Sequence, residues 1–240
     1  MPNPTAAMLV IGDEILSGRT RDANMYHLAG ELTKHGIDLK EVRVVSDDSA
    51  AIEAAVKALS DRFDHVFTSG GIGPTHDDIT ADCIARAFGD HIDIRDDARA
   101  LLEAHYQRTG LELNAARLRM ARIPDSATLI DNPVSTAPGF TIRNVHVMAG
   151  VPSVFQAMVA SVLPTLTGGQ PLLSQTLRID RGEGDIAETL SQLAADFPDL
   201  SIGCYPFQIN GAFGANVVVR GTDGARVDAA VTRLARESAQ

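Results

Sequence analysis

The chain has 240 residues, of which 45% are hydrophobic, and a formal net charge of −10. This length is enough for one large domain, or for a larger domain followed by a small one. No run of residues approaches the roughly 20 apolar positions of a membrane-spanning helix. Lysine and arginine are dispersed, so the electrostatic pattern of a nucleic-acid-binding protein is not seen. We therefore expect neither a membrane nor a nucleic acid as partner.

The cellular compartment is suggested by two features. The first ten residues lack the basic start and long apolar centre of a signal peptide. The two cysteines, Cys83 and Cys204, lie far apart and have no metal-ligand spacing, which is typical of free thiols in a reducing compartment. We expect a cytoplasmic protein.

Strand and helix signals alternate through the first two-thirds of the chain. In chain order, the hydrophobic pattern predicts strand 6–11, helix 24–35, strand 37–45, helix 50–62, strand 64–68 and helix 78–88. This alternation favours a parallel, doubly wound sheet of the α/β class. The next predicted elements are a mostly helical segment 95–120, short strands 127–130, 139–142 and 145–148, and helix 151–166.

The pattern changes after a glycine-containing linker at residues 167–171. The predicted elements beyond it are strand 174–179, helix 184–197, strands 200–208 and 212–220, and helix 223–237. Asn210-Gly211 between the last two strands is a strong hairpin signal. We expect two domains, over residues 1–168 and 172–240, and the second is a small α+β domain.

The most informative segment is the glycine-rich stretch at residues 68–80, between a predicted strand and a predicted helix. Its three glycines allow positive φ angles and a close approach of the backbone to a ligand. Successive N–H groups there can bind an anion, at the end of a strand where open α/β sheets bind ligands. The alternative is a Gly-Pro turn without function. The predicted phosphate-binding residues are Ser69, Gly70, Gly71, Gly73, Pro74 and Thr75.

Two acidic residues, Asp77 and Asp78, follow this loop and start the predicted helix. One of them can simply cap the helix, as Thr75 can. A carboxylate beside a bound phosphate can also hold a divalent cation or activate a hydroxyl group. We predict that Asp78, and with it Asp77, is catalytic and a metal ligand. His76 is a weaker candidate, because a histidine in a polar loop is more often only solvated.

The segment after the first strand, residues 12–18, should lie at the same end of the sheet. Asp13 and Glu14 suit the ring N–H groups of a ligand, or a metal, better than they suit a phosphate. A turn with a helix cap is the alternative. We predict that Gly12, Asp13, Glu14 and Ser17 bind the ligand.

Three further polar residues start helices near the same sheet end. Asn24 is an N-cap by default, and a ligand-binding residue otherwise. Asp47 or Asp48, after the second strand, is either a cap or a third acidic group of the site. Residues 132–140 and 150–153 form two more loops that could lie over a ligand, and Pro138 and Gly139 belong to the first of them.

Together these segments resemble the molybdopterin-binding domain of molybdenum-cofactor biosynthesis proteins. The resemblance is strongest to the version of this domain in the N-terminal region of CinA-type proteins. The matching motifs are at residues 12–18, 22–24, 69–80, 132–140 and 150–152, within a similarity over residues 6–165. The resemblance implies a three-layer α/β/α sandwich with a mostly parallel sheet. The second domain resembles the small middle domain of CinA, which suggests a homo-oligomer, either a dimer or a trimer.

The resemblance implies two kinds of chemistry. Relatives in cofactor synthesis adenylylate molybdopterin or insert molybdate, whereas CinA-type members look like metal-dependent pyrophosphatases acting on ADP-ribose. By motif, Asp78 matches the acidic residue after the glycine loop, and Asp47 matches the acidic residue after the second strand. Asp47 is therefore predicted to be catalytic together with Asp78 and Asp77. Molybdopterin is thus one candidate ligand, and Mg²⁺ or another divalent cation a candidate cofactor.

Two departures from the CinA pattern bear on these hypotheses. Val154 and Phe155 replace an acidic residue and a methionine, and Ser135 replaces a glycine. The amidohydrolase domain of full-length CinA is also not expected here. Three hypotheses stay open. The chain binds a phosphorylated pterin or nucleotide, or is a metal-dependent nucleotide pyrophosphatase or nucleotidyl transferase, or is a non-catalytic regulatory protein with a relic pocket.

Overall fold

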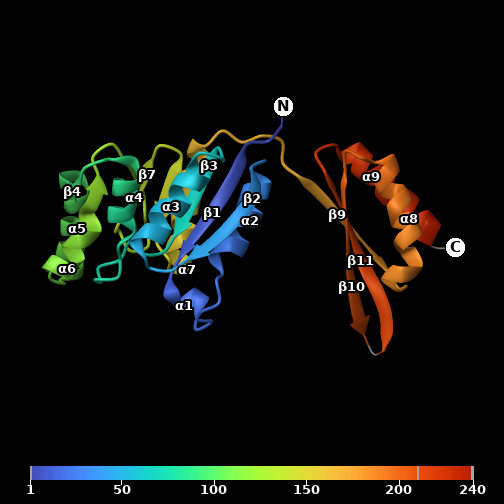
Figure 1. The fold of residues 1–240 in the computed structure, drawn as a ribbon, viewed down its shortest axis with the longest axis horizontal. Coiled ribbons are helices and arrows are strands. Elements are labelled where there is room, and N and C mark those ends of the chain that lie inside the picture. Colours follow the sequence, from blue (N-terminus) through green and yellow to red (C-terminus); the bar gives the residue numbers. More distant parts are fainter. Residues whose placement is uncertain (1, 210, 239–240) are drawn as a thin grey trace. The chain divides into compact units, whose positions relative to one another are not determined.

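The computed structural model describes residues 2–209 and 211–238 (Figure 1). The chain divides into two compact units between Gly169 and Gln170. Each unit has its own hydrophobic core. No helix in the described residues is long and apolar enough to cross a membrane.

The first unit is built around a six-stranded sheet. Its strands, in spatial order, are β2 (Asp38–Val45), β1 (Thr5–Ile11), β3 (His65–Ser69), β8 (Val145–Met148), β7 (Gly139–Ile142) and β6 (Thr128–Ile130). The first four are parallel, and β7 and β6 are antiparallel to their neighbours. The predicted mostly parallel sheet is confirmed.

Helices cover both faces of this sheet. On one face lie α2 (Asn24–Lys34) and α7 (Pro152–Val162), and on the other α3 (Ser49–Ser60), α4 (Thr80–Phe88) and α5 (Asp96–Thr109). The unit also contains the short helices α1 (Asp13–Leu16) and α6 (Ala115–Leu118), and the 3₁₀ turns η1 (Arg119–Ala121) and η2 (Leu163–Thr165). A small ribbon, β4 (Ile92–Ile94) with β5 (Arg122–Pro124), lies among them in the chain.

Strand β1 shows why the fold has three layers. Met8 and Val10 belong to a cluster with α2 and α7, whereas Leu9 and Ile11 belong to a cluster with α3 and α4. A strand covered on both faces needs apolar residues at successive positions, which is the continuous run that the sequence contains. The predicted α/β/α sandwich is confirmed.

One predicted helix start and one predicted helix cap are wrong. The helix predicted from residue 78 begins at Thr80, because the Asp78 carboxylate accepts hydrogen bonds from the Thr75 N–H and hydroxyl groups and so belongs to the preceding turn. Asn24 is not an N-cap; Ala23 takes that position, and Asp22 accepts the Met25 N–H.

The segment predicted as mostly helical, residues 95–120, is interrupted. Gly110, with φ 69°, ends α5 in the left-handed conformation that favours glycine. Helix α6 then starts at an Asn114 cap, whose side chain accepts the Arg117 N–H. The sequence pattern did not predict α1 or the β4–β5 ribbon, whose elements have only three or four residues each.

The second unit is a three-stranded antiparallel sheet with two helices. Its elements are β9 (Leu173–Ile179), α8 (Glu183–Asp196), β10 (Ser201–Ile209), β11 (Ala212–Gly221) and α9 (Gly224–Ser238). The strand order is β10-β11-β9, and the core lies between the sheet and the helices. The predicted antiparallel pairing of the last two strands is confirmed, while Asn210 of the predicted turn lies outside the described residues.

A buried histidine, His146, packed beside the half-buried His65, makes the stability of the first unit sensitive to pH. His146 is 3% exposed, and its Nδ1 lies 3.0 Å from the Thr141 hydroxyl. Its Nε2 lies 3.4 Å from Nδ1 of His65. Burial, and secondarily the charge of His65, lowers the pKa of His146 from 6.5 to about 3. His146 is therefore neutral in the folded protein.

We predict that acidification destabilises the protein through His146. Below about pH 6.5 the unfolded imidazole takes up a proton that the folded one does not. The stabilisation is thus complete above that pH, and falls by up to about 1.4 kcal/mol for each pH unit on the way down. Urea unfolding at about pH 7 and about pH 5 should show a smaller loss for His146→Gln than for the unmodified chain. An equal loss in both would contradict this prediction.

Candidate functional site

The largest concentration of predicted residues surrounds a cavity at the carboxyl ends of the parallel strands. The chain leaves β1 toward β2 on one side, while β3 lies on the other side of β1, which is where open α/β sheets bind ligands. The cavity has a volume of about 460 Å³. Nine of the predicted residues line it: Gly12, Glu14, Asp47, Gly70, Gly71, Gly73, Pro74, Asp77 and Asp78.

Glycines allow the loops to lie in backbone contact. Gly70 has φ 109°, and a side chain there would overlap the carbonyl oxygen of Ile11 at the end of β1. Gly71 has φ 69°, and a side chain there would overlap the Thr80 hydroxyl. A Cβ on Gly150, which follows β8, would come within 3.2 Å of the Gly70 Cα. Glycine is therefore needed at Gly70 and Gly71 for both space and conformation.

Some amides of this loop are hydrogen-bonded within the protein, and others are free. The Gly70 N–H donates to the Met148 carbonyl, and the Thr75 N–H donates to Asp78. Within the described residues, the N–H groups of Gly71, Ile72 and Gly73 make no hydrogen bond, and all three residues line the cavity. Three consecutive free donors can take an anionic oxygen.

Ile72 anchors the loop between those donors. Its side chain packs against both hydrophobic clusters of the first unit, one on each face of the sheet. This anchoring restrains the backbone without using its N–H groups. The loop is therefore held in place before a ligand arrives.

Carboxylates make the cavity acidic. Glu14, Asp47, Asp77 and Asp78 line it. Burial raises the pKa of Asp47, a bond from the Asp13 N–H (3.0 Å) opposes this, and the negative charges of Asp13, Glu14 and Asp77 add to the rise. Asp48, the other candidate after β2, caps α3 by accepting the Ala51 N–H at 2.9 Å. Of the two, Asp47 is the one at the cavity.

The carboxylates around the cavity do not form a set of ligands for a resident metal ion. In residues 2–209 and 211–238, no group of three or more His, Cys, Asp or Glu side chains is arranged to hold one. Asp78 is also engaged with Thr75. The residues present do not fit a resident divalent cation.

The other predicted ligand-binding residues do not line the cavity. Asn24 and Ser69 are buried and bonded to each other, since the Asn24 amide donates to the Ser69 hydroxyl and to the Gly150 carbonyl, both at 2.8 Å. Pro138 lines an adjoining hollow. The other predicted residues that line neither the cavity nor this hollow are Asp13, Ser17, Thr75 and Gly139.

Another wall of the cavity comes from two later segments of the chain, the loop after β6 and helix α7. Asn132 is buried, and its amide donates to the Ser135 hydroxyl at 2.6 Å and to the Ala137 carbonyl at 2.8 Å, which holds the loop in shape. Asn132, Ser135 and Val154 all line the cavity. Val154 thus gives an apolar wall where CinA-type proteins are expected to have an acidic residue.

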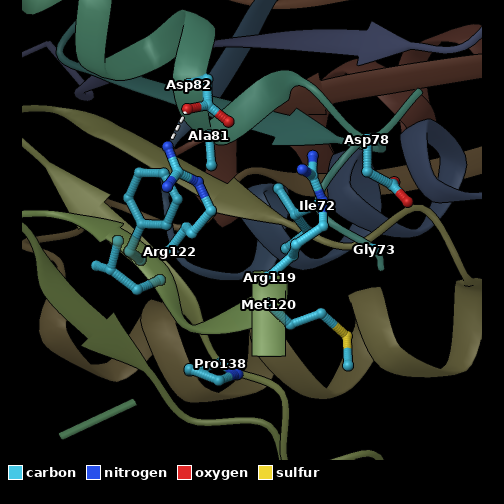
Figure 2. Close-up of a pocket in the computed structure, with 11 residues that line it drawn as sticks. Ile72, Gly73, Asp78, Ala81, Asp82, Arg119, Met120, Arg122 and Pro138 are labelled. Carbon is cyan, nitrogen blue, oxygen red and sulfur yellow. Dashed lines mark hydrogen bonds and ion pairs between the residues drawn. The ribbon is translucent and has the colours of Figure 1, made fainter. Parts of the chain in front are cut away.

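Two residues at the site were not predicted. Met120 lines the cavity, and both Met120 and Arg119 line the adjoining hollow with Gly73 and Asp78. Figure 2 shows the Arg119 side chain extending past Ile72, toward the side of the hollow on which Asp78 lies. Both residues come from η1, which no motif in the sequence marks.

Two family models together match nearly the whole chain. Residues 7–168 match the family described as "Probable molybdopterin binding domain". Residues 171–240 match the family described as "FAD synthase, middle domain". The second match gives the small unit a likeness to FAD synthase, where the sequence had suggested the middle domain of CinA.

Relatives and one solved structure agree with the first match. The chain is 36% identical over 256 residues to a "Probable FAD synthase" of Caenorhabditis elegans, which covers 96% of the chain and 49% of that protein. It is 41% identical over 167 residues to a CinA-like protein of Citrifermentans bemidjiense, covering 68% and 40%. The chain thus spans about half the length, or less, of these two relatives.

The solved structure is that of CinA from Thermoplasma acidophilum, described as having unknown function. It is 35% identical, has a TM-score of 0.62, and covers 68% of this chain and 97% of its own. The fold, the loops around the cavity and these matches lead to one assignment. This chain belongs to the molybdopterin-binding domain family, and its first 168 residues are of the CinA-like type.

Proposed function

We propose that the first unit binds a phosphorylated pterin or nucleotide in the cavity at the end of its sheet. The observation that carries this proposal is the set of free N–H groups on Gly71, Ile72 and Gly73, which line the cavity. The volume of about 460 Å³ lies within the range of small-molecule sites. A phosphate on these amides leaves the rest of the cavity for a ring and its hydrogen-bonding groups.

The matched relatives favour a nucleotide over a pterin as the first ligand to test. A relative named as a FAD synthase matches almost the whole chain, and the second unit matches a FAD synthase middle domain. The family of the first unit is named for molybdopterin. Both ligands carry phosphate and a flat ring, so both belong in one binding experiment.

We predict that a phosphorylated ligand stabilises the protein. A ligand at 100 times its dissociation constant should add about 2.7 kcal/mol to the free energy of unfolding. Thermal unfolding with molybdopterin, ADP-ribose, ATP and FAD, each with and without Mg²⁺, measures this. If none of the four shifts the transition temperature, the binding proposal is wrong, and a regulatory protein with a relic pocket is favoured.

We predict that Gly73→Ala weakens ligand binding at least about tenfold, or about 1.4 kcal/mol. The new Cβ would meet Asp78 Oδ2 at 2.6 Å, so the carboxylate or the loop must move. Gly30→Ala is the matched control, because its Cβ meets nothing within 4 Å in α2. The control should bind normally and gain about 0.5–1 kcal/mol in stability. If both variants bind the ligand with equal affinity, the glycine loop does not contribute to binding and this prediction is wrong.

A second candidate function is hydrolysis or transfer at a diphosphate. It is favoured by Asp78, whose carboxylate lines the cavity next to the proposed phosphate position. The prediction is that the protein, supplied with Mg²⁺, Mn²⁺ or Co²⁺, cleaves ADP-ribose to AMP and ribose phosphate, and that Asp78→Asn keeps binding but loses turnover. Chromatography of the products measures both. Intact ADP-ribose with every metal leaves the binding function alone.

The assembly and compartment stay predictions. We propose a cytoplasmic homo-oligomer, either a dimer or a trimer, on the basis of the sequence resemblance and the free cysteines. Light scattering on the purified chain measures its mass in solution. A monomer at micromolar concentration would contradict the proposed homo-oligomer.

A further inference from the structure

The cavity presents an unbalanced charge to an anionic ligand. The residues that line it include Glu14, Asp47, Asp77 and Asp78, and no lysine, arginine or histidine among those described. Each carboxylate repels a phosphate, and the repulsion is weakly screened where water is partly excluded. Free N–H groups carry only partial charges. A full positive charge next to the loop would therefore decide how tightly a phosphate binds.

Arg119 is placed to supply that charge. It lines the hollow that adjoins the cavity, and Ile72, Gly73 and Asp78 line both spaces. The Arg119 side chain is exposed, and its guanidinium forms no hydrogen bond or ion pair with any residue of the described ranges. An unpaired guanidinium beside free loop amides has all its donors available to a ligand.

The neighbouring arginine shows the contrast. Arg122 lines the same hollow, but its Nη2 donates to Asp82 at 2.6 Å, and its Nη1 lies 3.7 Å from Asp93. Figure 2 shows the Arg122–Asp82 pair joined, while Arg119 extends toward the loop. Arg122 is thus neutralised by the protein, and Arg119 is the one of the two that is not.

We propose that Arg119 binds the phosphate group of the ligand, together with the Gly71–Gly73 amides, and so determines the preference of the cavity for phosphorylated molecules. The planar guanidinium gives two parallel donors to phosphate oxygens, a geometry that lysine does not reproduce. This inference rests on the proposed binding function, because Arg119 acts on the ligand of that same cavity. It assigns a role to a residue that no motif marked.

The test is calorimetric binding of ADP-ribose to four forms of the chain. Arg119→Ala should raise the dissociation constant at least about tenfold, and Arg119→Lys should fall between it and the unmodified chain. Arg99→Ala is the matched control, because it removes one positive charge from an exposed α5 side chain paired with Glu103. The control should bind as the unmodified chain does.

Salt dependence separates a direct phosphate contact from a structural role. Affinity of the unmodified chain should fall as salt rises, and the affinity of Arg119→Ala should fall less steeply. Its unfolding by urea should be nearly unchanged, since the exposed guanidinium has no hydrogen bond or ion pair to lose. If Arg119→Ala binds as tightly as the unmodified chain, with or without Mg²⁺, this inference is wrong and the proposed function stands. If the unmodified chain binds none of the panel, both fail.

Discussion

The loops after β1, β3 and β8 touch backbone to backbone at one end of the sheet, and the candidate site exists because of this packing. Gly70 lies against the Ile11 carbonyl, and Gly150 lies against Gly70. Any larger residue at Gly70 would separate β1 from the glycine loop and would also be strained at φ 109°. After β3 the next three residues, Gly71 to Gly73, line the cavity, and their N–H groups are not hydrogen-bonded to a neighbouring strand.

Buried polar side chains fix the positions of these loops relative to one another. The Asn24 amide joins Ser69 of one loop to Gly150 of another, so α2 is tied to the ends of β3 and β8. Its Oδ1 is buried without a protein partner among the described residues. Without the Asn24 side chain, the Ser69 hydroxyl and the Gly150 carbonyl would lose these hydrogen bonds. A buried polar group without a partner lowers the stability of the folded state. Residues that resemble ligand contacts in the sequence can thus act by positioning the loops that make contact.

Local patterns were enough to predict the parallel sheet and the glycine loop, and the family resemblance added the three layers. The buried run of β1 and the helical spacing of α2 and α3 are signals carried by consecutive residues, and so are Gly70, Gly71 and Gly73. The roles of single polar residues were harder. Asp78 satisfies Thr75 rather than capping α4, and Asn24 follows the cap rather than forming it. Both outcomes depend on loop geometry that neither propensity nor spacing contains.

Residues brought in from distant segments were the least predictable. Arg119 and Met120 reach the site from η1, about 40 positions beyond the glycine loop, because α5 and α6 return the chain to it. Their sequence surroundings resemble any helical stretch with arginines. The pairing that neutralises Arg122 needs Asp82 and Asp93 from two other elements, so the difference between two nearby arginines is a tertiary property.

The charge arrangement of the cavity limits what can fill it. Free amides and Arg119 lie at the Ile72–Gly73 side, where Asp78 also lies but accepts hydrogen bonds from Thr75. Glu14 and Asp47 come from the loops after β1 and β2. A bare phosphate would use the first group and be repelled by the second. A ligand that also carries hydroxyl or N–H groups can donate hydrogen bonds to the carboxylates of Glu14 and Asp47, which then stabilise the complex as acceptors. Complementarity of both kinds, with the apolar wall at Val154 against a ring, favours a phosphorylated molecule with a heterocycle over a simple anion.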